Sequence, residues 1–110
     1  MSNRDFDIVV YGASGFTGRL VAEYMHKQYG RTVNWAMAGR SETKLAQVRD
    51  EMGISQDTPL VVADADDAAS LKAMAENTKV LLTTVGPYQL YGSPVVAACA
   101  AAGTDYVDLS

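Results

Sequence analysis

The sequence predicts an α/β domain built on a doubly wound parallel sheet with helices on both faces. Three observations support this. An unbroken apolar run from Ile8 to Val10 is typical of a strand buried on both faces of a parallel sheet. Three glycines and a helical sequence follow that run directly. Apolar strand-like segments and helical segments then alternate to the end of the chain, as right-handed βαβ crossovers require.

The three glycines, Gly12, Gly15 and Gly18, form a G-x-x-G-x-x-G pattern, one residue longer than the usual dinucleotide fingerprint. We expect Gly12 to allow a sharp turn, Gly15 to let the backbone approach a pyrophosphate, and Gly18 to let the helix pack closely on the sheet. A helix from Arg19 to about 28–30 would then aim its N-terminus at a phosphate. The alternative is a plain tight turn, since glycines also mark ordinary strand-to-helix connections.

Further elements follow in alternation. Strands are expected at 32–38, 60–63, 80–85 and 106–109. The intervening helices begin after Ser41 as N-cap, at Asp66 or Asp67, and at Pro94. Their inward faces carry Leu45, Val48 and Met52, then Leu71, Met74 and Ala75, and the glycines that end the second and fourth helices are Gly53 and Gly103. The predicted strand order is 3-2-1-4-5, which is a Rossmann-type domain.

Composition narrows the class of protein. With 110 residues, 48% of them hydrophobic and 20% charged, the chain is one globular domain. A net charge of −4 argues against nucleic acid or an anionic membrane surface as the main partner. Cys99 is the only cysteine and the longest apolar run, 95–102, is too short to cross a bilayer, so we expect a cytoplasmic protein with no membrane span.

The chain stops at Ser110, directly after the fifth expected strand. A parallel strand there has backbone groups that something must cover. We therefore expect residues 1–110 to be the N-terminal part of a longer two-domain protein, whose second domain holds a small-molecule substrate. A homodimer is compatible with these features.

Nucleotide choice is normally read at the end of the second strand, where NAD sites place a carboxylate. This sequence has Gly39 and Arg40 there instead, with Ser41 and Lys44 close behind. A guanidinium can fork onto a 2′-phosphate and stack on adenine, which favours NADP over NAD as the cofactor. The alternative is that Arg40 is a solvated loop cation that contributes little.

Two other strand ends are candidate cofactor contacts. Asp64, followed by Ala65, comes directly after the third strand, where it would accept a hydrogen bond from the adenine amino group or simply cap the next helix. After the fourth strand, a glycine would allow close approach to the nicotinamide ribose and Tyr88 or Tyr91 would wall the ring. The alternative is a proline-terminated turn with surface aromatics. The residues of that run are Val85, Gly86, Pro87 and Tyr88.

No catalytic group is evident. His26 is expected on the surface and Cys99 in the core. The chain has no Tyr-x-x-x-Lys pair, no paired carboxylates and no metal-ligand spacing.

Several stretches together resemble the N-terminal domain of saccharopine dehydrogenase-like oxidoreductases, which include the trans-acting enoyl reductases of lipid biosynthesis. The matching runs cover nearly the whole chain, and the Val-Gly-Pro-Tyr run is far more specific than the glycines. They are 10–18, 35–40, 61–66, 82–88 with 91–92, and 106–109. The resemblance implies a Rossmann domain that binds NADP(H), followed in full-length relatives by a second α/β domain. At the matched positions it implies cofactor contacts. The first matching run supplies those of Gly12, Ser14, Gly15, Phe16, Thr17 and Gly18, and the later runs supply the others.

The leading functional hypothesis is the cofactor domain of an NADP-dependent oxidoreductase that moves hydride to or from a carbonyl, imine or enoyl group. The alternative is a non-catalytic NADP(H)-sensing module that acts through a protein partner.

Overall fold

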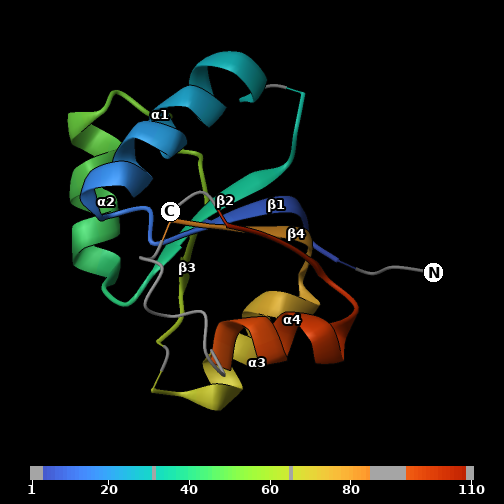
Figure 1. The fold of residues 1–110 in the computed structure, drawn as a ribbon. Helices are drawn as coiled ribbons and strands as arrows, with labels where there is room; N and C mark the ends of the chain where they lie inside the picture. The colour runs from blue at the N-terminus through green and yellow to red at the C-terminus, as the bar shows by residue number, and fades with distance from the viewer. Residues whose placement is uncertain (1–3, 31, 65, 85–93, 109–110) are drawn as a thin grey trace.

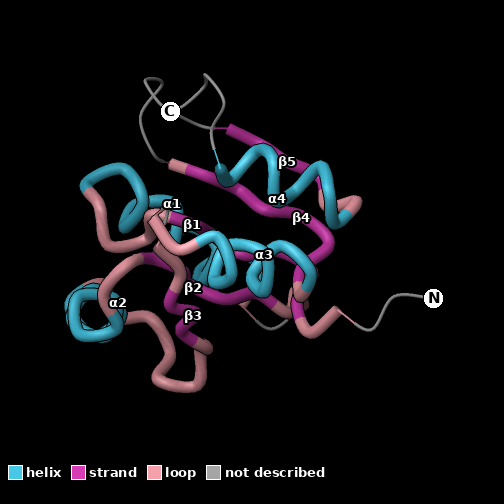
Figure 2. Tube along the Cα trace, turned by 90° about the horizontal axis from the view of Figure 1, so that it is seen from below, coloured by secondary structure: helices cyan, strands magenta, loops and turns pink. Residues whose placement is uncertain are grey.

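The computed structural model of the chain describes residues 4–30, 32–64, 66–84 and 94–108. Strands and helices alternate through them (Figure 1), in the order β1 (Phe6–Tyr11), α1 (Phe16–Tyr29), β2 (Trp35–Gly39), α2 (Glu42–Glu51), β3 (Leu60–Val62), α3 (Ala68–Glu76), β4 (Thr78–Thr83), α4 (Pro94–Ala102) and β5 (Asp105–Asp108). All strand pairs are parallel and the sheet order is β3-β2-β1-β4-β5, which confirms the predicted topology (Figure 2).

The sheet lies between two helical layers. Figure 1 shows α1 and α2 on one side of the sheet and α3 and α4 on the other. Successive residues of β1 point to opposite sides, so Val10 packs with Met37 and Leu45 while Val9 packs with Leu71 and the α3–α4 side. Both valines are completely buried, which confirms the two-sided burial predicted from the apolar run. None of the helices formed by the described residues is long and apolar enough to span a membrane.

The predicted helix signals are found in place. Ser41 caps α2, its hydroxyl accepting a hydrogen bond from the Lys44 N–H at 3.3 Å. Asp67, not Asp66, caps α3. Gly53 and Gly103 follow α2 and α4 with φ of 69° and 70°, a conformation that favours glycine.

Several predicted boundaries are wrong by two or three residues. Helix α1 begins at Phe16, not Arg19, because its first turn packs directly on the glycine turn. Strand β2 begins at Trp35, not Thr32, because the N–H groups of Thr32 and Val33 both donate to the carbonyl of Tyr29 and close the end of α1. Strand β4 begins at Thr78, which pairs with Phe6.

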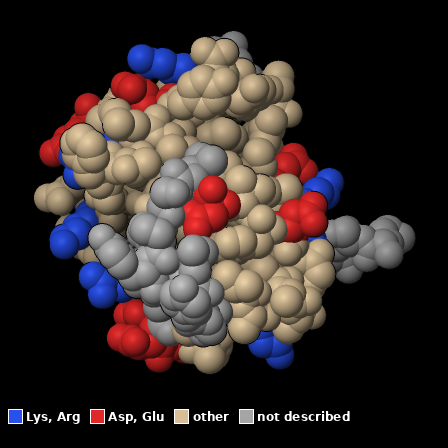
Figure 3. All heavy atoms as spheres, in the orientation of Figure 1, with Lys and Arg blue, Asp and Glu red and all other residues tan. Residues whose placement is uncertain are grey.

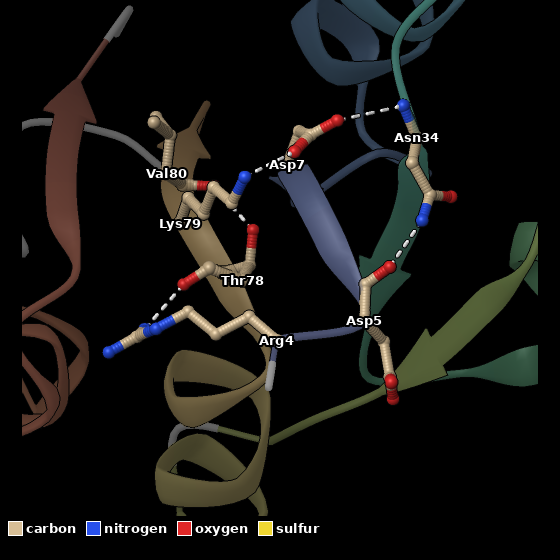
Figure 4. A network of polar contacts seen from close by, with 7 residues as sticks. All are labelled: Arg4, Asp5, Asp7, Asn34, Thr78, Lys79 and Val80. Atoms are coloured by element: carbon tan, nitrogen blue, oxygen red, sulfur yellow. Dashed lines mark hydrogen bonds and ion pairs between the residues drawn. The ribbon is translucent and has the colours of Figure 1, made fainter. Parts of the chain in front are cut away.

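A polar network ties the strands together at their amino ends (Figure 4). The Asp7 carboxylate lies 3.1 Å from the Lys79 ammonium and accepts a hydrogen bond from the Asn34 N–H at 3.3 Å. The Arg4 guanidinium reaches further and donates to the Thr104 hydroxyl and to the carbonyls of Ala75, Thr78 and Ala102. Two of these carbonyls lie in the last turns of α3 and α4, so one cation satisfies the ends of two helices.

Candidate functional site

Turns from four strands meet at the carboxyl edge of the sheet. The N–H groups of Gly12 and Ala13 donate to the Ala38 carbonyl at 2.9 and 3.1 Å, which joins the turn after β1 to the end of β2. Ala63 N–H donates to the Gly39 carbonyl at 2.9 Å and joins the turn after β3 to the same point. On the other flank, the Thr84 N–H donates to the Tyr11 carbonyl at 3.1 Å and links the end of β4. This is the edge at which doubly wound sheets bind ligands.

The glycine turn has the close approach that its spacing predicts. Gly12 has a φ of 84°, which lets the chain turn sharply out of β1. A Cβ on Gly18 would lie 1.9 Å from the Gly12 carbonyl oxygen and 2.9 Å from the Ala13 Cα, so only glycine allows α1 to pack this closely. The first turn of α1 therefore lies directly over the end of β1.

The N–H groups of this turn divide into used and available donors. The Gly15 N–H donates to the Gly12 carbonyl at 3.0 Å and closes the turn. The N–H groups of Ser14, Phe16 and Thr17 have no acceptor among the described residues. An anion would thus meet the N–H groups on either side of Gly15, at the positive end of the α1 dipole.

The turn after β2 brings cations next to these donors. Arg40 and Lys44 are exposed, and Ser41 is half-buried at the start of α2. The Ser14 hydroxyl reaches toward this turn, since a Cβ on Gly39 would lie 3.6 Å from the Ser14 Oγ. Neither position 39 nor position 40 carries a carboxylate, and Glu42 is the first acidic residue of α2.

The turn after β3 is organised by its own side chains. One oxygen of the half-buried Asp64 carboxylate accepts a hydrogen bond from the Asp66 N–H at 2.9 Å. The Ser70 hydroxyl accepts from the Asp64 N–H at 3.0 Å. Asp64 therefore forms a local turn rather than capping α3. The other predicted site residues at these strand ends, Ala65, Val85, Gly86, Pro87 and Tyr88, lie outside the described residues.

The sequence did not identify Tyr11, the residue just before Gly12. Its side chain is buried at the carboxyl end of β1, and burial raises its phenol pKa, with a further rise from Asp64 that Arg40 opposes. Tyr11 is thus within electrostatic reach of both the β2 and the β3 turns. The sequence around a buried residue at the end of a strand does not indicate that the residue lies next to a site.

Arg19 was missed as well. Its guanidinium donates to the Ser14 carbonyl at 3.3 Å and lies 3.9 Å from the Glu51 carboxylate. Its Nε is buried without a partner among the described residues. The position one residue after the third glycine is a signal that could have identified this cation.

The described residues also line an open hollow of about 740 Å³ at the opposite edge of the sheet. It lies between the end of α1, the start of β2 and the segment before β3, and its lining includes His26, Trp35 and Asp57. It is separate from the four turns. Among the described residues no group of three or more histidine, cysteine, aspartate or glutamate side chains is arranged to hold a metal ion.

Residues 8–110 match the family model described as the saccharopine dehydrogenase NADP binding domain. The chain belongs to this family. It is 52% identical over 110 residues to the trans-acting enoyl reductase of Mycobacterium ulcerans, a match that covers 99% of this chain and 26% of that protein. The chain spans about a quarter of the length of the curated relatives it matches.

Solved structures agree with the fold. The apo saccharopine dehydrogenase (L-Glu forming) of Saccharomyces cerevisiae superposes on this domain with a TM-score of 0.72 at 22% identity, over 96% of this chain and 22% of that one. The NADPH-dependent quinone oxidoreductase QOR2 of Escherichia coli, solved with NADPH, gives a TM-score of 0.68 at 25% identity, over 91% of this chain and 35% of that one. The predicted family, Rossmann-type fold and NADP cofactor are confirmed.

The residues present fit the cofactor of this NADP-binding domain. The N–H groups of Ser14, Phe16 and Thr17, which have no acceptor among the described residues, suit a diphosphate at the start of α1. The exposed Arg40 and Lys44 beside it carry the charge that a 2′-phosphate requires.

Proposed function

We propose that this domain is the cofactor domain of a longer NADP-dependent oxidoreductase. The observation that carries the proposal is the adjacency of the α1 N-terminus and the Arg40 turn, which lacks a carboxylate where an NAD site would have one. The diphosphate lies over the first turn of α1, and Arg40 pairs with the 2′-phosphate of the adenosine.

Individual roles follow from the described geometry. The backbone from Gly12 to Gly18, including Ser14, Gly15, Phe16 and Thr17, contacts the diphosphate. The Ser41 hydroxyl accepts a hydrogen bond from the Lys44 N–H and can still donate its own proton. Ser41, Arg40 and Lys44 together hold the 2′-phosphate. The Asp64 oxygen that the turn leaves free accepts from the adenine amino group. Contacts from Ala65 and from Val85 to Tyr88 remain predictions.

The bound NADP(H) supplies the hydride, and this domain holds and orients it. We infer a carbonyl, imine or enoyl acceptor. The curated relatives about half identical to this chain are named trans-acting enoyl reductases, which favours the enoyl group. The substrate binds to the part of the longer protein that this chain does not span. A cytoplasmic location fits a domain whose one cysteine, Cys99, is buried and forms no disulfide.

Substitution of Arg40 tests the proposal. Arg40→Ala should weaken NADPH binding tenfold to a hundredfold, on the order of a lost charge-assisted hydrogen-bond pair, and change NADH binding less than about twofold. Isothermal titration of both nucleotides measures the two effects.

Lys72→Ala is the matched control, because Lys72 is an exposed cation on α3, which lies on the opposite side of the sheet from α1 and α2 (Figure 1). It should leave both affinities unchanged. Equal weakening of NADPH and NADH by Arg40→Ala would contradict the assignment of Arg40 to the 2′-phosphate.

A further inference from the structure

Helix α1 presents large apolar side chains to the outside of the domain. Phe16 is 84% exposed, Leu20 51% and Tyr24 55%. Their four-residue spacing places them on one face, opposite the buried Gly18, Ala22 and Met25. The Tyr29 ring extends this face, meeting the Tyr24 ring edge to face with centroids 6.0 Å apart. We call these four residues (16, 20, 24 and 29) the α1 stripe.

The outward side of a surface helix is normally polar, and a contiguous apolar stripe marks a contact surface. Through its first two turns the exposed positions of α1 are Phe16, Thr17 and Leu20, none of them charged. Where Figure 1 places α1, the surface in Figure 3 is mostly tan, with charged groups toward its margin. Further along α1 the half-buried Glu23 and the exposed Lys27 form an ion pair, so the first two turns are the part of this surface suited to an apolar partner.

Among the described residues, the same side of the sheet is only partly covered over β4 and β5. Leu82 points to the α1–α2 side, where it packs against the cluster that contains Val10. Its neighbour in the parallel register is Val107, which is 39% exposed on the edge strand. Because α3 and α4 both lie on the other side, the described helices leave this end of the sheet covered on one face only. Parallel sheets are stable when both faces are covered.

We propose that the part of the longer protein beyond this domain packs an apolar face against the α1 stripe and over Leu82 and Val107. The relatives supply the reason for this occupant: they are about four times as long as the matched segment, so most of each protein lies outside it. One amphipathic element beside α1 would bury the stripe and complete the second helical layer of the sheet.

The position of Phe16 connects this contact to the cofactor. Phe16 is the first residue of α1, directly after Gly15, so the covering element reaches the edge of the glycine turn. This consequence rests on the proposed diphosphate site, whereas the contact itself does not.

Thiol labelling of the full-length protein tests the contact. In a Cys99→Ala background, with labelling of each introduced thiol followed by peptide mass spectrometry, Leu20→Cys and Tyr24→Cys should react with a maleimide at least tenfold more slowly than Lys72→Cys, which is exposed on α3 on the other side of the sheet. All three thiols should react equally in urea. Reaction of Leu20→Cys as fast as Lys72→Cys in the native protein would overturn the proposal. Protection that appears only as protein concentration and dimer mass rise would also overturn it, since the occupant is then a second copy.

Oxidative footprinting needs no substitution and covers the case in which a variant fails to fold. In the native full-length protein Phe16, Tyr24 and Tyr29 should be oxidised as slowly as the buried Trp35, and rapid oxidation of them contradicts the contact. Neither readout depends on Arg40. Loss of the NADPH preference and loss of the interface are thus separate results.

Discussion

At the scale of single residues, the site depends on how closely two pieces of backbone approach. Gly12 turns with a positive φ, and Gly18 sits against its carbonyl with no room for a side chain. Gly15 is different, since a Cβ there would lie 3.3 Å from the Gly12 oxygen and otherwise point outward, where the backbone is exposed. Gly18 is thus needed for packing, whereas Gly15 leaves backbone exposed beside the proposed diphosphate site.

This difference predicts two separable substitutions. Gly18→Ala should lower the free energy of unfolding by about 2 kcal/mol or more, because α1 must move off the turn, and should abolish NADPH binding. Gly15→Ala should change the free energy of unfolding by less than about 1 kcal/mol, because the new Cβ would be only slightly too close to the Gly12 carbonyl oxygen, but it should weaken NADPH binding. Urea unfolding and nucleotide titration of both variants provide the measurements. Equal stability losses would show that the two glycines do not differ in this way.

Local sequence signals identified the residues whose roles are local. Ser41 is an N-cap because serine before a helical run is favoured there. The proposed role of Arg40 likewise rests on a local signal, since it stands where NAD sites have a carboxylate. Tyr11 and Arg19 were missed because their roles depend on Asp64 and Glu51, which are brought near only by folding. For Asp64 the two alternatives, an adenine contact and a helix cap, differ in the geometry of a single turn, which the sequence does not determine.

At the scale of elements, Asp7 connects the amino end of β1 to both neighbouring strands. The side-chain contact with Lys79, and then the hydrogen bond from the Asn34 backbone, lower the pKa of the Asp7 carboxyl below 3.8. One carboxylate on β1 thereby contacts both neighbouring strands, through Asn34 just before β2 and Lys79 on β4.

A carboxyl whose folded pKa is lowered adds stability above its unfolded pKa and loses it as pH falls through the folded value. Asp7→Asn should therefore be less stable than the parent above about pH 5, and the difference should shrink below pH 3.8. Urea unfolding between pH 7 and pH 3 measures it. Lys79→Met should lose part of the same contribution, and a double variant that shows fully additive losses would contradict the pairing.

Element order and type were predictable from apolar runs, glycines and caps, since each element carries its own signal. The boundaries were not. Phe16, Thr17 and Gly18 are poor helix formers that become helical because the turn packs on them, and residues 32–34 leave the strand because they close α1. In both places tertiary contacts override local propensity.

At the scale of the whole molecule, Arg4 links segments up to 100 positions apart in the sequence. It joins the chain before β1 to the ends of α3 and α4, and the Thr104 hydroxyl reinforces it by donating to the Ala75 carbonyl at 2.5 Å. No sequence pattern indicated this, because a single arginine near a terminus resembles any solvated cation.

Arg4→Met keeps the apolar stem and removes the donors. It should lower the free energy of unfolding by about 2 kcal/mol, because carbonyls at two helix ends then lose a charged partner. Chemical denaturation measures this, with Lys72→Ala as a control that should change stability by less than about 0.5 kcal/mol. Unchanged stability in Arg4→Met would show that water replaces the guanidinium at no cost.

The separation between the two ends of the sheet also matters for protein engineering. The Arg4 and Asp7 contacts lie at the amino ends of the strands, and the proposed coenzyme contacts lie at the carboxyl ends. Thermostabilising changes can therefore be screened at one end while coenzyme preference is redesigned at the other. Such changes should combine additively, which makes this domain a convenient scaffold for switching between phosphorylated and unphosphorylated nicotinamide coenzymes.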